Sequence, residues 1–379
     1  MLLSKQAGGT VTPATARPTE VPLPVLPLII GTYTTTLGHV DGHNEGILGT
    51  SLDTTTGEFG PVTLLARTRN PSYLALSADG RSLYASDESA DTGDRTGGTV
   101  TAFTRDPATG ALTAQTCRPS GAGACHVVVD PSGRHVLTAN YVSGSVSVFP
   151  VGADGDIGEP TAVVQHEGSS VHPRRQTAAH AHMIGLDPRT GDVLVPDLGM
   201  DAVLGYTLGP DGTLTPRPEL RVDAPAGAGP RHLAFHPDGE RLYVLCELGS
   251  TVLALRRDGA GFRRTAVVST LPAGFDEPNL TAAIRVSPSG RHVLVSNRGH
   301  DSTAVLRVDD DSDEPVLVHN EPGRGAYPRE LALSPDGRIV LLGNQNSDEL
   351  VAFTFDDDTG ALTHLGTLNT ANPVCVVFP

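Results

Sequence analysis

An arginine and a glutamate stand at the two ends of one predicted β-hairpin. Arg231 and His232 precede its first strand and Glu247 follows its second, in the sequence GPRHLAFHPDGERLYVLCEL. The two ends of an antiparallel hairpin lie side by side, so these side chains can meet. A guanidinium can stabilise a developing oxyanion while a carboxylate or imidazole moves a proton. A structural salt bridge between Arg231 and Glu247 is the alternative, because a buried carboxylate needs a partner.

Other polar residues occupy equivalent positions, before a predicted first strand or after a predicted second strand. They include Asn70, Asp87, Glu88, His126, Asn140, Tyr141, His180, His182, Asp197, Asn279, Asn297, Arg298, Arg329, Glu330, Asn344 and Gln345. His180 and His182 alternate as in a strand, so both rings face one side and could bind a metal, cap a turn or bind an anion. Arg298 could form a structural ion pair. Turn capping is the favoured role of Asn140 and Asn297 taken singly.

These positions belong to a repeated unit of two apolar strands joined by a Pro/Asp-x-Gly turn. Six copies start at Leu74, Val127, Ile184, Leu233, Ile284 and Leu331. Proline fixes φ and glycine tolerates positive φ, so these sequences suit tight turns. A third and a fourth strand are predicted after each hairpin. Copies about 45–57 residues apart, each with four strands, are typical of propeller blades.

The two ends of the chain supply one further blade. PLIIGTYT, from Pro27, matches a second strand, and PVCVVFP, from Pro373, matches a first strand. Six whole copies and this composite predict an all-β, seven-bladed propeller of four-stranded antiparallel blades. Pairing of the C-terminal strand with the N-terminal blade would close the ring and remove exposed sheet edges. We expect one domain over residues 27–379 and, from its Thr, Pro and Ala content, a disordered tail over residues 1–26.

The predicted architecture gathers the polar positions at one place. The first strand of a propeller blade is innermost, so the starts of first strands and the ends of second strands surround the mouth of the central channel. Arg231 and Glu247 should therefore face the same mouth as His182 and Arg298. A polar pocket over the channel is predicted. The acidic run Asp309–Glu314 is expected to be a solvated loop instead.

Composition excludes several classes of function. The formal net charge is -16, which argues against a nucleic-acid surface, because such a surface needs a stripe of basic residues. Lys5 is the only lysine, so no lysine Schiff base or lysine base is available in the folded body. No stretch approaches the roughly 20 apolar residues of a membrane span. Four scattered cysteines without metal spacing predict reduced thiols and a cytoplasmic protein.

Cofactor and nucleophile motifs are also missing from the sequence. No glycine-rich phosphate loop precedes a helix, so a nucleotide cofactor lacks support. Gly121–Cys125 is not a nucleophile elbow, because no strand–Ser–helix context surrounds it. Cys125 and His126 are adjacent, so their side chains should point to opposite faces of a strand and not form a dyad. We expect no cofactor and no metal.

Eight short segments combine into one recognisable pattern. They are Gly31–Thr34, Ala139–Tyr141, His180–His182, Asp197–Gly199 with Asp201, Gly229–His232, Glu247–Leu248, Asn297–Gly299 and Pro328–Arg329. Together they resemble the lactonase family of seven-bladed propellers over about residues 27–379. That family includes propeller-type 6-phosphogluconolactonases and fungal-type carboxy-cis,cis-muconate lactonising enzymes. Glu330 stands where many relatives have an aromatic residue, and the insert Asp91–Gly98 lengthens a rim loop and could alter substrate access.

The resemblance implies which residues act. His182, Arg231, Glu247 and Arg298 match the catalytic residues of the family. The predicted substrate-binding residues on the same rim are His180, His232, Arg329, Asn297, Asn140 and Asp197. Glu247 or His182 could be the base, and Arg231 and Arg298 would hold the carbonyl oxygen or the anionic end of the substrate.

The leading hypothesis for function is hydrolysis of a sugar lactone, 6-phosphoglucono-1,5-lactone to 6-phosphogluconate, by a carboxylic ester hydrolase. Three alternatives stay open: cycloisomerisation of a carboxylated muconate to a lactone, a non-catalytic binding propeller, and a metal-dependent sugar lactonase. The expected partner is a small anionic sugar lactone, with no nucleic acid and no membrane. The protein is expected to be a monomer or a weak homo-oligomer.

Overall fold

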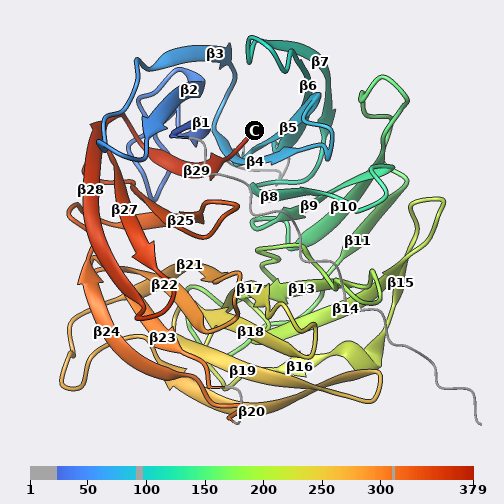
Figure 1. The fold of residues 1–379 in the computed structure, drawn as a ribbon. Coiled ribbons are helices and arrows are strands. Elements are labelled where there is room, and N and C mark those ends of the chain that lie inside the picture. The colour runs from blue at the N-terminus through green and yellow to red at the C-terminus, as the bar shows by residue number, and fades with distance from the viewer. Residues whose placement is uncertain (1–23, 91–96, 310–311) are drawn as a thin grey trace, which may run out of the picture.

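The computed structural model of the protein describes residues 24–90, 97–309 and 312–379. Its strands form seven antiparallel sheets arranged as a ring around a central channel (Figure 1). Six sheets have four strands, and the seventh has four plus a short fifth strand. The predicted all-β, seven-bladed propeller is confirmed. Among the described residues no helix is long and apolar enough to cross a membrane.

Within each blade the strands follow one another from the central channel outward. The composite blade consists of β29 (Pro373–Val377), β1 (Val25–Thr32), β2 (Gly46–Asp53) and β3 (Thr63–Arg67). The second blade consists of β4 (Pro71–Leu76), β5 (Ser82–Asp87), β6 (Thr99–Arg105) and β7 (Leu112–Pro119), and the third of β8 (Ala124–Val129), β9 (His135–Asn140), β10 (Ser145–Pro150) and β11 (Ala162–Gln165). The fourth consists of β12 (Gly185–Leu186), β13 (Val193–Asp197), β14 (Ala202–Leu208) and β15 (Leu214–Pro216). The 3-10 turn η1 (Pro218–Leu220) and strand β16 (Val222–Asp223) follow it. The fifth blade consists of β17 (Pro230–Phe235), β18 (Arg241–Cys246), β19 (Thr251–Asp258) and β20 (Gly261–Ser269). The sixth consists of β21 (Leu280–Val286), β22 (His292–Arg298), β23 (Ser302–Arg307) and β24 (Val316–Pro322). The seventh consists of β25 (Pro328–Leu333), β26 (Ile339–Asn344), β27 (Glu349–Asp356) and β28 (Ala361–Asn369).

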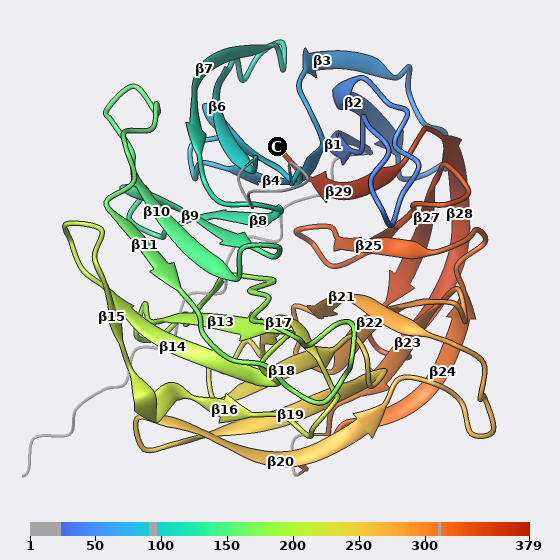
Figure 2. The same cartoon turned by 180° about the vertical axis from the view of Figure 1, so that it is seen from behind.

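The ring closes through the composite blade, as the sequence predicts. Strand β29 pairs antiparallel with β1, with Ile29 opposite Val377 and Ile30 opposite Val376. Figure 2 shows the red strand β29 beside the blue strand β1. Strand β1 begins at Val25, two residues before the expected start of the domain, because Val25 still pairs with Asp53 of β2. Residues 1–23 of the predicted tail and residues 91–96 of the predicted rim insert lie outside the described residues.

The hydrophobic core lies between neighbouring blades. Strand β18 is buried along its whole length, since the blades on both sides cover its two faces. Leu233 and Val244 of this blade pack with Leu194 and Val203 of the preceding one. Outer strands such as β20 alternate between covered and exposed residues instead. Buried second strands explain the continuous apolar runs of the sequence, because both faces of each strand avoid water.

A one-residue β-bulge interrupts the innermost strand of every blade near the channel mouth. In four blades the pairing with the second strand skips one identifiable residue of the innermost strand: Ser72, Cys125, Arg231 and Arg329. In the composite blade it is Val374. The blade of β21 has one extra residue between the pairs Thr281–Asn297 and Ile284–Val295, and the blade of β12 has one between Ala181–Asp197 and Gly185–Leu194. A bulge re-aims a side chain, and in three blades the extra residue, Cys125, Arg231 or Arg329, contacts an ionisable group near the mouth.

Candidate active site

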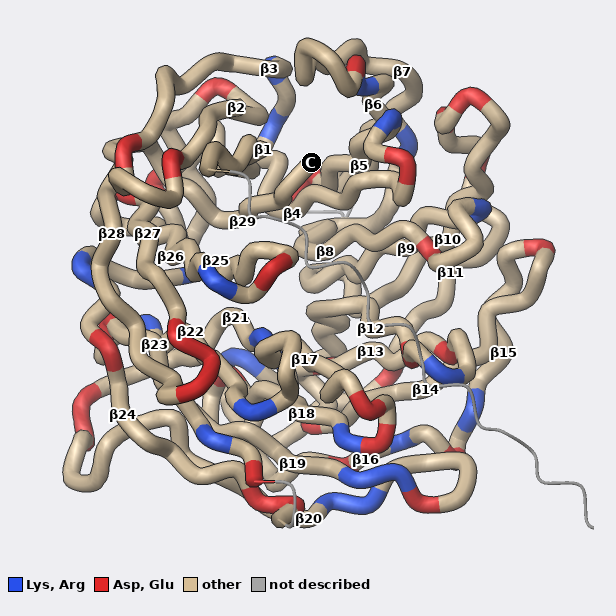
Figure 3. Tube along the Cα trace, viewed as in Figure 1, with Lys and Arg blue, Asp and Glu red and all other residues tan. Residues whose placement is uncertain are grey.

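A cavity of about 280 Å³ lies at the channel mouth where the polar pocket was predicted. Its lining comes from six of the seven blades and from two long loops. The lining residues are His39, Glu88, Gly123, Tyr141, Val142, Arg175, His182, Glu247, Leu280, Arg298, Tyr327 and Arg329. At about 30 Å³ per water molecule, the cavity has room for roughly nine waters or one small sugar-sized molecule. Elsewhere, acidic residues are spread over the outer loops and turns (Figure 3).

Several depressions are larger than this cavity. One of about 440 Å³ is lined by Pro272 and His319, and one of about 350 Å³ is lined by Tyr73 and Phe235. Two others lie away from the channel mouth. They have volumes of about 850 and 670 Å³ and are lined by turns such as Asp79–Gly80 and Pro107–Gly110, or Asp336–Gly337 and Asp356–Asp358. Such turns join first to second strands, or third to fourth strands, and therefore lie at the opposite rim. We regard the smaller cavity as the site, because buried ionisable groups of both signs converge on it.

Glu247 is the centre of the first charged cluster. Its Oε2 atom accepts hydrogen bonds from Arg231 Nε at 3.0 Å and forms an ion pair with Arg298 Nη2 at 2.9 Å, while Oε1 accepts from Arg175 Nη2 at 2.6 Å. Burial alone would raise the pKa of Glu247, but Arg298, Arg175 and Arg231 together hold that pKa well below its usual range. Glu247 is therefore an ionised carboxylate held in one position, and a poor proton donor at neutral pH.

Arg231 lies beneath the cavity and does not line it. Its Nη1 atom donates to the carbonyl oxygen of Ala282 and lies 3.0 Å from His232 Nε2. Burial, followed by the charges of Arg329 and Arg298, lowers the pKa of Arg231 to about 10, so it stays charged at neutral pH. Arg231 therefore contacts both Glu247 and His232 and fixes their positions. Arg298 does line the cavity, and its buried Nε has no hydrogen-bond partner among the described residues.

His182 provides a neutral imidazole beside this cluster. Its Nε2 lies 4.0 Å from Glu247 Oε2, and its ring meets Tyr141 edge-on at 5.3 Å. Burial, followed by the charge of Arg231, lowers the pKa of His182 well below its ordinary value. The Sγ atom of Cys125, which lies on the neighbouring blade, is 3.7 Å from His182 Nδ1. Cys125 and His126 were expected to point to opposite faces of their strand, and the thiol of Cys125 contacts His182 instead.

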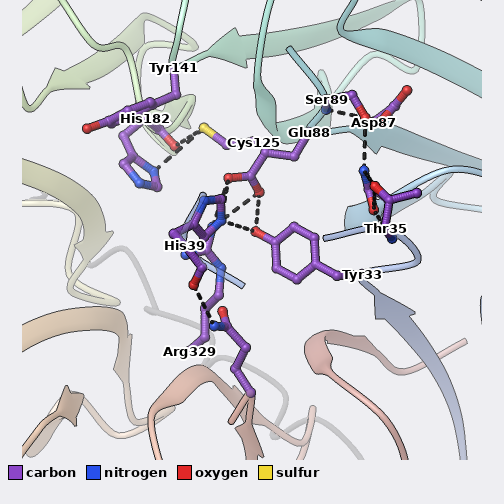
Figure 4. A network of polar contacts seen from close by, with 12 residues as sticks. Tyr33, Thr35, His39, Asp87, Glu88, Ser89, Cys125, Tyr141, His182 and Arg329 are labelled. Carbon is purple, nitrogen blue, oxygen red and sulfur yellow. Dashed lines mark hydrogen bonds and ion pairs between the residues drawn. The ribbon is translucent and has the colours of Figure 1, made fainter. Parts of the chain in front are cut away.

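A second charged cluster lines the same cavity around Glu88. Tyr33 donates its hydroxyl to Glu88 Oε2 at 2.6 Å, and Arg329 Nη2 lies 3.1 Å from both carboxylate oxygens. His39 Nε2 is 3.3 Å from the Tyr33 hydroxyl and 3.8 Å from Glu88 Oε1. Figure 4 shows Tyr33, His39 and Glu88 pointing toward one another, with Cys125 and His182 close by.

Several predicted substrate-binding residues lie outside the cavity lining. Asn140 bonds Ser120 and serines of its own blade, and Asn297 bonds Thr270 and Ser302. Asp197 accepts from His166 and from backbone N–H groups that include His180 N. These bonds tie strand ends to neighbouring segments, and those of Asn140 and Asn297 are of the kind that turn capping predicts. The placement gives no support to direct substrate contact by these three residues.

Of the remaining predicted residues, some lie behind the cavity wall and one lines the cavity. His180 stacks on Tyr141 at 4.4 Å and lies 2.8 Å from the Tyr141 carbonyl oxygen, behind the cavity wall. His232 lies below, in contact with Arg231. Arg329 lines the cavity as expected for a binding residue. Glu330 pairs with Arg285 inside the channel at 2.9 Å, so its acid has a buried structural partner.

Sequence reasoning missed Arg175, His39 and Tyr33 as site residues. Arg175 lies in the irregular segment 166–181 between β11 and β12, and His39 and Tyr33 lie in the loop after β1. Arg175 and His39 lie outside the repeated unit, so the repeat contains no signal for them, whereas Tyr33 directly follows the second strand of the composite blade and is equivalent to Glu88. Glu88 is among the predicted rim residues but not among the predicted site residues. Its position directly after a second strand, equivalent to that of Glu247, could have identified it.

The chemistry of the donors does not suit a bound cation at Glu247. Three guanidinium groups surround this carboxylate and would repel a metal ion. Within the described ranges no group of three or more His, Cys, Asp or Glu side chains is placed to hold a metal. An anion or a polar neutral molecule fits the arrangement better, because arginine forks match carboxylate and phosphate geometry.

Comparison with known proteins points in one direction. The family model described as "Lactonase, 7-bladed beta-propeller" matches residues 27–378. A 6-phosphogluconolactonase of Bacillus subtilis is 38% identical over 353 residues, which cover 92% of this chain and 97% of the relative.

Solved structures give the same similarity. A periplasmic gluconolactonase of Pseudomonas aeruginosa superposes with a TM-score of 0.86 at 33% identity, covering 93% of this chain and 99% of the other. A putative 6-phosphogluconolactonase of Bacteroides fragilis superposes with a TM-score of 0.85 at 29% identity, covering 96% and 99%. The similarity therefore extends over the whole propeller and not over isolated blades.

Proposed function

Because the chain belongs to the lactonase family of seven-bladed β-propellers, we propose that it hydrolyses a sugar lactone, specifically 6-phosphoglucono-1,5-lactone to 6-phosphogluconate. The observation that carries this proposal is the Glu247 cluster. A neutral imidazole, an ionised carboxylate and three guanidiniums converge at a cavity of single-sugar size. Ester hydrolysis needs a base for water, positive charge at the developing oxyanion and a proton for the leaving alkoxide.

The reaction balances with the groups of this cluster. Water attacks the lactone carbonyl carbon, forming a C–O bond, while its proton passes to His182. Arg298 stabilises the negative charge that develops on the carbonyl oxygen. Collapse of the intermediate breaks the ring C–O bond, and the imidazolium returns the proton to the leaving alkoxide. The product is a hydroxy acid, which ionises at neutral pH.

His182 is the better candidate for the base. It lines the cavity, where it can contact a bound water, and its imidazole is neutral near pH 7 because burial lowers its pKa. Glu247 is already committed to three guanidiniums, which weakens it as a base. At 4.0 Å from His182 Nε2, the Glu247 carboxylate instead stabilises the imidazolium that forms during the reaction.

Arg175 is the best placed arginine for the phosphate of the substrate. Its side chain is 34% exposed, whereas the side chains of Arg231, Arg298 and Arg329 are at most 9% exposed. Among the described residues, the four arginines and the two carboxylates Glu247 and Glu88 leave an excess of two positive charges around the cavity. A phosphate monoester carries about two negative charges near neutral pH and matches this excess.

The test is a pH-stat assay with 6-phosphogluconolactone and gluconolactone. We expect the protein to accelerate proton release above the spontaneous rate with at least the phosphorylated substrate. Glu247→Gln should lower kcat about 100-fold, because the carboxylate stabilises a charge that forms during the reaction. No acceleration with either lactone would overturn the proposed function, whereas wild-type activity in Glu247→Gln would overturn only the role of that residue.

A second candidate activity is cyclisation of a carboxylated muconate to a lactone. The same excess of positive charge would suit a polycarboxylate, and an acid–base pair could move the proton in the reverse direction. Loss of muconate absorbance on addition of the protein would favour this activity. The binding-only alternative is disfavoured, because a propeller that only binds a partner on its rim has no need of a buried arginine–carboxylate pocket.

We propose that the protein works in the cytoplasm, as its cysteines suggest. Cys117, Cys125, Cys246 and Cys375 are all unpaired thiols. One similar structure comes from a periplasmic gluconolactonase. Fractionation of the native host, with a cytoplasmic and a periplasmic marker, tests the expected compartment.

A further inference from the structure

The cavity contains one carboxylate that the proposed reaction does not use. Glu88 follows strand β5 and lines the cavity with His39 and Arg329. We call Glu88, Tyr33, His39 and Arg329 the Glu88 half, and Glu247, Arg175, Arg231, Arg298 and His182 the Glu247 half. Three distant parts of the chain build the Glu88 half: the loop after β1, the end of β5 and the bulge of β25. This assembly holds the carboxylate in one position.

The two halves differ in charge. In the Glu88 half one guanidinium faces one carboxylate, so the charges cancel. In the Glu247 half three guanidiniums face one carboxylate, which leaves two positive charges. An anionic or oxyanion-forming part of a ligand is therefore attracted to the Glu247 half. A neutral polar part is left to face the Glu88 half.

Protonation states support this division. Burial would raise the pKa of Glu88, but Arg329, His39 and the hydrogen bond from Tyr33 together leave that pKa below its usual value. Burial raises the pKa of Tyr33 well above its ordinary value, so the phenol stays neutral. Burial also lowers the pKa of His39, although its side chain is 47% exposed. Near neutral pH the half thus presents a fixed acceptor, a fixed cation and a neutral imidazole.

Such a set of groups suits hydroxyls. An ionised carboxylate only accepts hydrogen bonds, a guanidinium only donates, and a neutral imidazole does one of each. A hydroxyl can do both, so neighbouring hydroxyls on a sugar ring can satisfy all three groups at once. A bare hydrocarbon ring would displace water from these polar groups without replacing its hydrogen bonds, which costs binding energy.

We propose that the Glu88 half binds the ring hydroxyls of the substrate, and that Glu88 selects polyhydroxylated lactones over unsubstituted ones. The inference rests on the proposed lactonase function, because it assigns the substrate's orientation in that same cavity. The lactone carbonyl lies at the Glu247 half and the hydroxyl-bearing carbons lie at the Glu88 half. Glu88 is then a specificity-determining residue.

The test compares two six-membered lactones that differ in their hydroxyls. We measure kcat/KM for glucono-1,5-lactone and for δ-valerolactone, and express specificity as their ratio. The wild-type ratio should favour gluconolactone strongly, since a site built to bond a hydroxyl can reject an analogue that lacks it by up to about 10⁴–10⁵-fold. Glu88→Gln should lower the ratio at least about tenfold, because the amide presents one donor where the site needs an acceptor.

Asp87→Asn is the matched control. Asp87 is the neighbouring carboxylate, but it bonds Arg69 and Ser89 and lies on the other side of the strand end from the Glu88 contacts (Figure 4). Its ratio should stay within about twofold of the wild type, because Asp87 is buried outside the cavity lining and its loss should affect both lactones equally. His39→Ala is a second probe, because this half-exposed ring can be removed with little effect on folding. It should lower the ratio in the same direction as Glu88→Gln.

An equal loss of kcat/KM on both lactones in Glu88→Gln would overturn the inference and leave Glu88 as a structural residue. If the wild type hydrolyses neither of these two lactones, calorimetric titration still tests the half, and the proposed function fails only if 6-phosphogluconolactone is not hydrolysed either. Gluconate should bind the wild type at least about tenfold more tightly than 5-hydroxypentanoate, and Glu88→Gln should lose this preference. Equal binding of the two hydroxy acids by the wild type would overturn the hydroxyl site itself.

Discussion

The neutral imidazole of His182 determines how the activity should respond to pH. A base works only in its unprotonated form, so activity is present above the pKa in the folded protein and is lost as pH falls through it. Burial and Arg231 place that pKa well below 6.5, the ordinary value of histidine. The carboxylates Glu247 and Glu88 are ionised over the same range, because each has a lowered pKa.

We therefore predict a kcat/KM that is flat between about pH 6 and 8 and falls only at distinctly lower pH. Initial rates of lactone hydrolysis, corrected for the spontaneous reaction at each pH, provide the measurement. A half-maximal rate near pH 6.5 would show that the base has an ordinary histidine pKa and would contradict this prediction.

Arg231 should act through its neighbours, since it touches Glu247 and His232 and does not line the cavity. Substituting Arg231 by Met removes a charge that lowers the pKa of His182, so the acid limb of the rate profile should move to higher pH. We also expect kcat/KM to fall about tenfold to a hundredfold, which is about 1.4 to 2.8 kcal/mol. The same pH series measures both effects.

Arg241→Met is the control for this prediction. Arg241 is a buried arginine of the same hairpin that bonds Asp238 and His236 at the opposite end. Its loss should affect stability but leave the position of the acid limb unchanged. An acid limb that stays in place in Arg231→Met would mean that Arg231 has only a structural role.

At the scale of elements, one aspartate fixes the segment that carries Arg175. Asp201 Oδ1 accepts from Gln176 Nε2 and Gly229 N, and Oδ2 accepts from Ser170 Oγ and Gly227 N. These bonds tie the segment 166–181 to the chain that leads into Arg231. The positions of Arg175 and Arg231 therefore depend on the same carboxylate.

Asp201→Asn should raise the KM for the phosphorylated lactone about tenfold. The amide replaces one acceptor by a donor that faces existing donors, while asparagine still tolerates the positive φ of 52° at this position. Asp348→Asn is the comparison variant, because Asp348 has a φ of 57° and bonds Asn372 and His43, which support the loop of His39 and not the segment of Arg175. A KM that rises equally in both variants would indicate general destabilisation and contradict the assignment.

Sequence periodicity predicts the elements and misses what the loops contribute. The repeated hairpins give the blade count, the ring closure and the mouth at which Arg231, Glu247 and Arg298 meet. Arg175 and His39 escaped prediction because they lie in irregular loops whose path depends on tertiary bonds to Asp201, Gln345 and Asn372. The bulges escaped as well. One extra residue in a short strand does not change a pattern of consecutive apolar residues enough to be seen.

At the scale of the whole molecule, stability should depend on the strand that closes the ring. Val376 of β29 is buried and packs with Leu28 of β1 and with Leu341 of the preceding blade. Val376→Ala removes two methyl groups and should lower the free energy of unfolding by about 2 kcal/mol. Denaturant unfolding followed by circular dichroism measures the change.

Val163→Ala provides the comparison. Val163 of β11 is 60% exposed, so its truncation should change stability by less than about 0.5 kcal/mol. Equal effects of the two substitutions would mean that closure through β29 contributes little to stability.

The seven bulges also bear on how such a ring can change its chemistry over time. Every blade has one extra residue in its innermost strand near the mouth, and the chain uses these positions unequally. Cys125, Arg231 and Arg329 contact ionisable groups, whereas Ser72 is a small hydroxyl and Val374 packs with Tyr33 and Val40. Because the backbone detour already exists in each blade, a single codon change at Ser72 or Val374 could add a functional group without a new loop. Directed libraries confined to these positions would sample new substrate preferences while the scaffold stays intact.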